Sequence, residues 1–138
     1  MDATALEQAL ERVDDQQAVF APYEEIIAAL DACERLPGAE KFLPGIWQRR
    51  VGVLSRYDRP DDERARVLDD YLALGEPLQW RAGRIVGCCA DRPELARRYL
   101  LPVIAELEAV RGTDPVLDAM LHDLRICRDR TLGTQPVP

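Results

Sequence analysis

The segment PGIWQRRVGVLSRYDRPDDERARVLDDYLAL, residues 44–74, aligns without a gap with PLQWRAGRIVGCCADRPELARRYLLPVIAEL, residues 77–107. Nine of the 31 aligned positions are identical, at a constant offset of 33 residues. The identical pairs are Pro44/Pro77, Trp47/Trp80, Val53/Val86, Asp58/Asp91, Arg59/Arg92, Pro60/Pro93, Arg64/Arg97, Leu68/Leu101 and Leu74/Leu107. In each copy a proline begins one helix and an Asp-Arg-Pro turn ends it. The leucines of the next helix then face the first helix. Each copy is therefore predicted to form a helix–turn–helix hairpin.

A period of 33 residues is typical of proteins built from two-helix repeats. On this period and on the equivalent tryptophans Trp47 and Trp80, residues 44–107 resemble the tetratricopeptide and HEAT class of α-solenoid repeats. The segment LLPVIAEL, residues 100–107, also resembles the start of a HEAT helix. The resemblance implies stacked antiparallel hairpins that serve as a scaffold for binding other proteins.

Helical spacing of apolar residues continues on both sides of the repeat, and no segment has the pattern of a strand. We therefore predict one all-α domain over residues 1–132, with about seven helices and a flexible tail at 133–138. The flanking helices either cap the two-hairpin stack or close it into a compact bundle. The expected helix signals are a Thr4/Glu7 capping box, a start at Pro22, caps at Asp58 and Asp91, a kink or break at Pro102, and a cap at Asp114 before Pro115.

Composition narrows the class of protein. The chain has 138 residues, 47% of them hydrophobic, which is enough to bury a core without disulfides. No apolar run approaches the roughly 20 residues that span a bilayer, and the N-terminus lacks the basic start of a signal peptide, so we expect a cytoplasmic protein. The net charge of −7 argues against nucleic acid as a partner. Arginine supplies all but one of the 18 basic residues, as expected from a GC-rich bacterial genome.

Two patterns invite a catalytic or metal-binding interpretation, and each has a plainer one. The carboxylates at 61–63 and 69–70 could hold magnesium and a diphosphate, but acids also favour the first turn of a helix. A zinc site could be drawn from Cys88, Cys89, Cys127 and His122, but paired-cysteine zinc spacing is missing. With no nucleophile or phosphate-loop motif either, we predict no catalytic residue, cofactor or metal site, and cysteines that are mostly buried.

The binding candidates lie on the first helix of each predicted hairpin. Trp47 and Trp80 either pack between hairpins or serve as exposed anchors, and nearby arginines either pair within the chain or line a groove for an acidic partner. The predicted partner-binding residues are Trp47, Arg50, Trp80, Arg81 and Arg84. The leading hypothesis is a non-catalytic protein–protein interaction module of adaptor, immunity or antitoxin-like, or accessory-subunit type. Its partner would be another protein, with an acidic segment or a second copy as options. The alternative is a small-molecule-binding protein or small helical enzyme with a pocket between hairpins.

Overall fold

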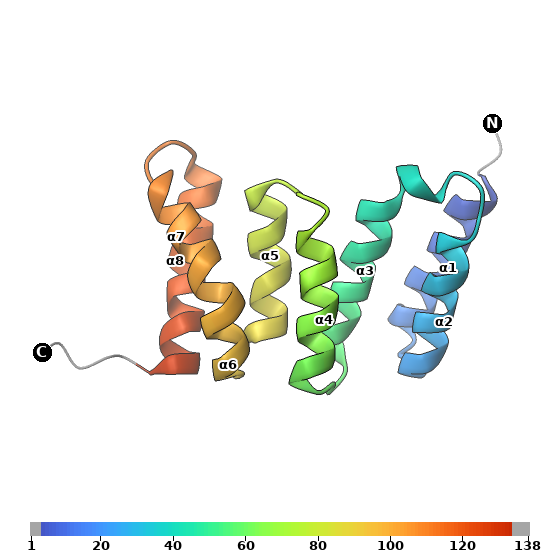
Figure 1. The fold of residues 1–138 in the computed structure, drawn as a ribbon, viewed down its shortest axis with the longest axis horizontal. Helices are drawn as coiled ribbons and strands as arrows, with labels where there is room; N and C mark the ends of the chain where they lie inside the picture. The colour runs from blue at the N-terminus through green and yellow to red at the C-terminus, as the bar shows by residue number, and fades with distance from the viewer. Residues whose placement is uncertain (1–3, 134–138) are drawn as a thin grey trace, which may run out of the picture. The chain divides into compact units, whose positions relative to one another are not determined.

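The computed structural model describes residues 4–133, and this part of the chain forms helices and no strands (Figure 1). The all-α fold predicted from the sequence is confirmed. None of the helices in the described range is both long enough and apolar enough to cross a membrane. The helices are α1 (Ala5–Ala18), α2 (Tyr23–Glu34), α3 (Leu43–Arg56), α4 (Asp61–Leu72), α5 (Leu78–Cys89), α6 (Pro93–Leu95), α7 (Leu101–Ala109) and α8 (Pro115–Leu132). A short 3₁₀ turn, Ala39–Lys41, precedes α3, and a π-helical segment, Ala96–Leu100, joins α6 to α7 in one continuous helical run.

The chain divides into two compact units, residues 1–58 and 59–138. The boundary falls between α3 and α4, inside the first copy of the predicted repeat. Helices α3 and α5 end 33 residues apart, at Arg56 and Cys89, and begin 35 residues apart, at Leu43 and Leu78. The single domain over 1–132 and the solenoid stacking of the hairpins stay predictions. The predicted tail at 133–138 lies outside the described residues except for Gly133.

The first unit is built on the antiparallel hairpin of α1 and α2, with α3 packed against α2 (Figure 1). Thr4 caps α1 as predicted, because its hydroxyl accepts a hydrogen bond from the backbone N–H of Glu7 at 3.1 Å. The apolar stripes of the three helices meet in one core, since residues three or four apart share a helix face. Its buried members on these helices are Leu6, Leu10, Val13, Ile26, Leu30, Cys33, Ile46 and Val53.

The second unit is organised around α5, which packs against α4, α6, the π-helical segment, α7 and α8. Four α5 side chains are buried, Ala82, Ile85, Cys88 and Cys89. Helix α5 lies parallel to α8, since Gly83 faces Met120 and the backbone N–H of Asp91 donates to the Thr131 hydroxyl. This central position buries one face of α5 and leaves the face with Trp80, Gly83 and Gly87 exposed.

Helix boundaries confirm some of the sequence signals and correct others. The π-helical segment ends at Leu100, two residues before Pro102, so the regular α-helical hydrogen-bond pattern changes just before the residue that lacks an N–H. Asp114 caps α8, with its carboxylate 2.8 Å from the N–H of Val116 and Pro115 as first helical residue. The helix predicted to start at Pro22 starts one residue later, with Pro22 itself as N-cap.

The predictions of caps at Asp58 and Asp91 were wrong. Pro60 occupies the N-cap position of α4, because the helix begins at Asp61 rather than directly after Asp58. Arg92 occupies the N-cap position of α6, and Asp91 has φ 60° in the turn before it. In both turns the N-cap position therefore falls after the aspartate, at Pro60 and at Arg92.

Removing the Asp114 cap should measurably lower the stability of the protein. Asp114→Ala removes the acceptor for the Val116 N–H, which should lower the free energy of unfolding by about 1 kcal/mol and the melting temperature by about 3–5 °C. Thermal unfolding followed by circular dichroism measures it. Asp123→Ala, an exposed substitution in the middle of α8, is the control. An equal change in both variants would contradict the capping role.

Candidate functional site

The five predicted partner-binding residues fall into two groups. Trp47 and Arg50 lie on α3 in the first unit, and Trp80, Arg81 and Arg84 lie on α5 in the second. The members of each group are neighbours along one helix. Each group is therefore described by itself, within its own unit.

Arg50 is buried and binds two carboxylates within the first unit. Its residue is only 8% exposed, and Nη2 donates to Asp31 at 2.8 Å and to Glu34 at 2.7 Å. The guanidinium also stacks 4.9 Å from the ring centroid of Trp47, which is half-buried. Arg50 thus ties α3 to α2, and the alternative interpretation of paired arginines fits it better than a groove for an acidic partner.

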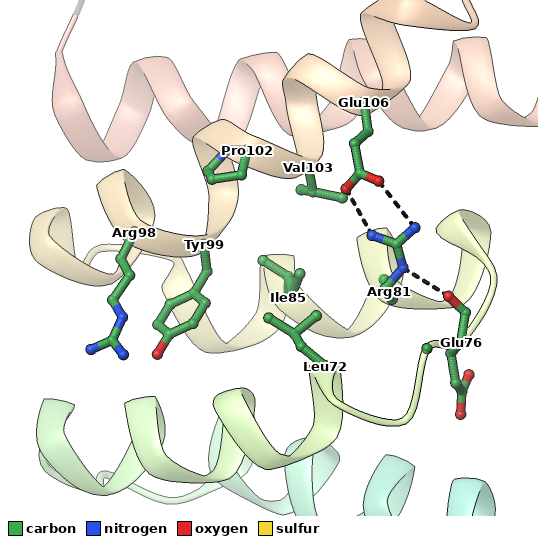
Figure 2. A pocket seen from close by; sticks show the side chains of 10 residues that line it. Leu72, Glu76, Arg81, Ile85, Arg98, Tyr99, Pro102, Val103 and Glu106 are labelled. Carbon is green, nitrogen blue, oxygen red and sulfur yellow. Dashed lines mark hydrogen bonds and ion pairs between the residues drawn. The ribbon is translucent and has the colours of Figure 1, made fainter.

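Arg81 is similarly engaged in the second unit (Figure 2). Its two terminal nitrogens donate to the two carboxylate oxygens of Glu106 at 2.7 and 3.2 Å, and Nε donates to the backbone oxygen of Glu76 at 2.7 Å. A bidentate pair of this kind fixes the guanidinium in one orientation. Arg84 is half-buried, and its charge acts on the phenol of Tyr71, so it also interacts with α4.

Trp80 differs from these residues because half of its side chain is exposed. It is 50% exposed and lies one helical turn before Gly83, whose Cβ position would be 3.7 Å from the Met120 side chain. Val116 lies one turn before Met120 on the parallel helix α8 and is 52% exposed. The two exposed apolar residues therefore occupy neighbouring turns at the same end of α5 and α8. We call Trp80, Gly83, Val116 and Met120 the α5–α8 surface.

A separate cavity of about 320 Å³ lies between α4 and α7, with α5 behind it (Figure 2). Apolar side chains form its middle part, and Figure 2 places the Arg81–Glu106 pair at one end and Arg98 at the other. The apolar lining residues are Leu72, Ile85, Pro102 and Val103. This volume lies near the lower end of the range found for small-molecule sites. A pocket between hairpins was the alternative interpretation of the sequence, but no local pattern identifies these lining residues, because the walls come from helices about 30 residues apart.

Two tyrosines near this cavity have hydroxyl groups whose pKa is raised. The Tyr99 hydroxyl lies 2.6 Å from an Asp69 oxygen and 3.1 Å from the Ala65 backbone oxygen, and burial together with the Asp69 hydrogen bond raises its pKa. Tyr71 is fully buried, and the Glu76 carboxylate acts on its hydroxyl. Burial raises the pKa of Tyr71 to about 12. Both phenols are therefore protonated at neutral pH, and neither is prepared to act as a base.

The cysteines are free thiols with no sign of activation. Cys33, Cys88 and Cys89 are buried as predicted, whereas Cys127 is half-buried. Burial raises the pKa of Cys88 to about 11 and that of Cys89 to about 12, which suppresses the reactive thiolate. Within residues 4–133, no three His, Cys, Asp or Glu side chains are grouped so that they could hold a metal ion.

Comparison with known proteins returns no relative. No family model matches the sequence, and no curated protein or solved structure shows significant similarity to it. The function must therefore be inferred from the residues and geometry of this chain.

The buried position of Arg50 predicts a structural role. Arg50→Ala leaves Asp31 and Glu34 without their shared cation, and it should lower the free energy of unfolding by about 2 kcal/mol. This is less than the roughly 3–5 kcal/mol of a fully buried pair, because both carboxylates are partly solvated. Chemical denaturation measures the loss. Arg12→Ala, an exposed change on α1, should have little effect. Equal stability of the two variants would contradict this structural role, and Arg50 would remain a candidate for binding a partner.

Proposed function

We propose that this protein is a non-catalytic protein–protein interaction module that binds its partner through the α5–α8 surface. The observation that carries the proposal is the half-exposed indole of Trp80 on α5, with the exposed Val116 one turn before the Gly83–Met120 approach on α8. An adaptor, an immunity or antitoxin-like protein, and an accessory subunit would all use such a surface, as would a homodimer.

Exposed tryptophan has a physical reason to mark an interface. Its large rigid ring gains contact area on binding and loses little conformational entropy, so tryptophan is enriched among the residues that dominate binding energy. Because about half of the indole is exposed to water, its burial stabilises the fold less than that of a core tryptophan would. Two such residues on adjacent helical turns form a larger apolar patch than single scattered residues do.

The backbone beside Trp80 is accessible as well. Gly83 and Gly87 are exposed on α5, one turn apart, and neither has a side chain that would keep a partner away from the helix. A partner side chain or helix could therefore approach α5 closely next to the indole. This supports an apolar partner surface more than an acidic one, because Arg81 already pairs with Glu106.

The test compares two exposed apolar residues on different surfaces. A tagged wild-type chain is crosslinked in its native cells, the partner is identified and purified, and dissociation constants are measured by calorimetry. Trp80→Ala should weaken binding at least about tenfold, as expected for a central interface tryptophan. Its circular dichroism spectrum should match that of the wild type.

Leu101→Ala is the matched control, since Leu101 is an exposed apolar residue on α7. This control should bind like the wild type. Equal affinity of the Trp80→Ala variant and the wild type for every recovered partner would overturn the proposal for this surface.

A second candidate function is small-molecule binding in the cavity between α4 and α7. Its support is the 320 Å³ volume with an apolar middle and charged groups at both ends, which suits a small amphipathic ligand. A library of small carboxylates and amines screened by heteronuclear NMR should shift the resonances of Leu72, Tyr99 and Val103 together. Shifts confined to other residues, or no shifts at millimolar concentration, would exclude this candidate.

A further inference from the structure

A second apolar feature lies in the first unit, at the end of α1. Val19 and Phe20 follow the last turn of this helix and are 75% and 64% exposed. Neither belongs to the core formed by α1, α2 and α3. The two side chains form an exposed apolar pair, here called the α1–α2 tip, which nothing in the sequence pattern had singled out.

The backbone at this tip is in a conformation that phenylalanine disfavours. Phe20 has φ 53°, in the left-handed region. Its N–H donates to the Gln17 oxygen at 3.1 Å, and the N–H of Ala21 donates to the Gln16 oxygen at 2.9 Å. These two bonds define a Schellman motif, whose left-handed position is usually glycine. A side chain with a Cβ at that position costs about 1–2 kcal/mol.

Two contacts from the end of α3 hold the tip in place. The Tyr57 hydroxyl donates a hydrogen bond to the backbone oxygen of Ala21, and the Arg56 guanidinium lies 4.3 Å from the ring centroid of Phe20. The ring is thus fixed in position without being buried. Fixing a side chain before binding reduces the entropy that binding must overcome.

Folding alone does not account for phenylalanine at this position. Burial would offset the backbone strain, but most of the ring remains in water. A stacked arginine at an exposed site contributes only about 0.5–1 kcal/mol. Strain kept at an exposed apolar residue is characteristic of sites that act on another molecule.

We propose that the α1–α2 tip is a second protein-docking element, in which Phe20 and Val19 insert into an apolar pocket of a partner protein. A carboxylate on the rim of that pocket would pair with Arg56, which forms no ion pair with a carboxylate among residues 4–133. Charge favours a protein over an anionic membrane, because residues 1–58 carry 11 acidic and six basic side chains. The tip belongs to a different unit from Trp80, so this proposal does not depend on the α5–α8 surface.

The first experiment uses the purified chain alone. Phe20→Gly relieves the left-handed strain, so the melting temperature should stay the same or rise by up to about 4 °C. Phe20→Ala keeps the strained Cβ, and it should melt no higher than the glycine variant. A fall of more than about 3 °C in the glycine variant would show that the ring is needed for folding, and it would overturn the proposal.

The second experiment measures binding. A photoreactive p-benzoylphenylalanine at position 20 should crosslink in native cells to a protein, and the crosslinked peptide should line an apolar pocket with a carboxylate at its rim. The same residue placed at Glu11, an exposed position on α1, is the control. For the purified partner, Phe20→Gly should weaken binding at least tenfold and Arg56→Glu at least fivefold, while Arg12→Ala should leave affinity unchanged.

Several outcomes would overturn the docking role. They are no crosslink above the Glu11 control, a crosslink to a surface without an apolar pocket, and unchanged affinity of the glycine variant. Cosedimentation with phosphatidylcholine–phosphatidylserine vesicles that depends on Phe20 would also overturn it, by assigning the tip to a membrane. Loss of affinity in Trp80→Ala alone would leave this result unaffected, which separates the two proposals.

Discussion

Arginine–carboxylate pairs join helices within each unit, and they determine which surfaces remain available for binding. Arg49 holds Asp14 through two hydrogen bonds and so ties α3 to α1. Arg81 holds Glu106 in the same bidentate way and ties α5 to α7. The second unit has three more arginine–carboxylate ion pairs, which are Arg92–Asp61, Arg98–Asp69 and Arg125–Glu108. Most of these pairs are partly exposed, so each adds little stability. Together they orient the helices and engage the arginine side chains within the chain.

This use of arginine explains why apolar side chains carry both proposals. A chain with 18 basic and 25 acidic residues has enough carboxylates to pair nearly every arginine internally. An arginine already held by two oxygens must lose that pair before it can bind an external acid, so the gain from the new contact is small. Exposed apolar surface carries no such competing interaction. The indole of Trp80 and the ring of Phe20 therefore offer more binding energy per residue than the paired guanidiniums do.

The sequence predicts the fold of this protein better than it predicts the binding surface. Helix positions follow from local signals, such as Asp114 before Pro115 and the spacing of apolar residues, which act over a few residues. The partners of Arg49 and Arg81 are 35 and 25 residues away, and no local pattern indicates them. Trp47 and Trp80 align in the sequence, yet one stacks on a buried arginine and the other is half-exposed. The two tryptophans have different environments because α3 and α5 pack against different helices.

Strain and exposure together distinguish Phe20 from an ordinary surface residue. The left-handed position after a helix stabilises the chain most when it holds glycine, because glycine has no Cβ to clash with the backbone. Asp91 has a similar backbone, with φ 60°, but a short polar residue adopts that conformation more readily than an aromatic one. Phenylalanine in this conformation therefore needs a compensating interaction. The stacked Arg56 compensates only in part, and in our proposal a partner that buries the ring supplies the remainder. Val19 beside it widens the apolar contact, so the tip presents a small anchor fixed by the end of α3 rather than a loosely held loop.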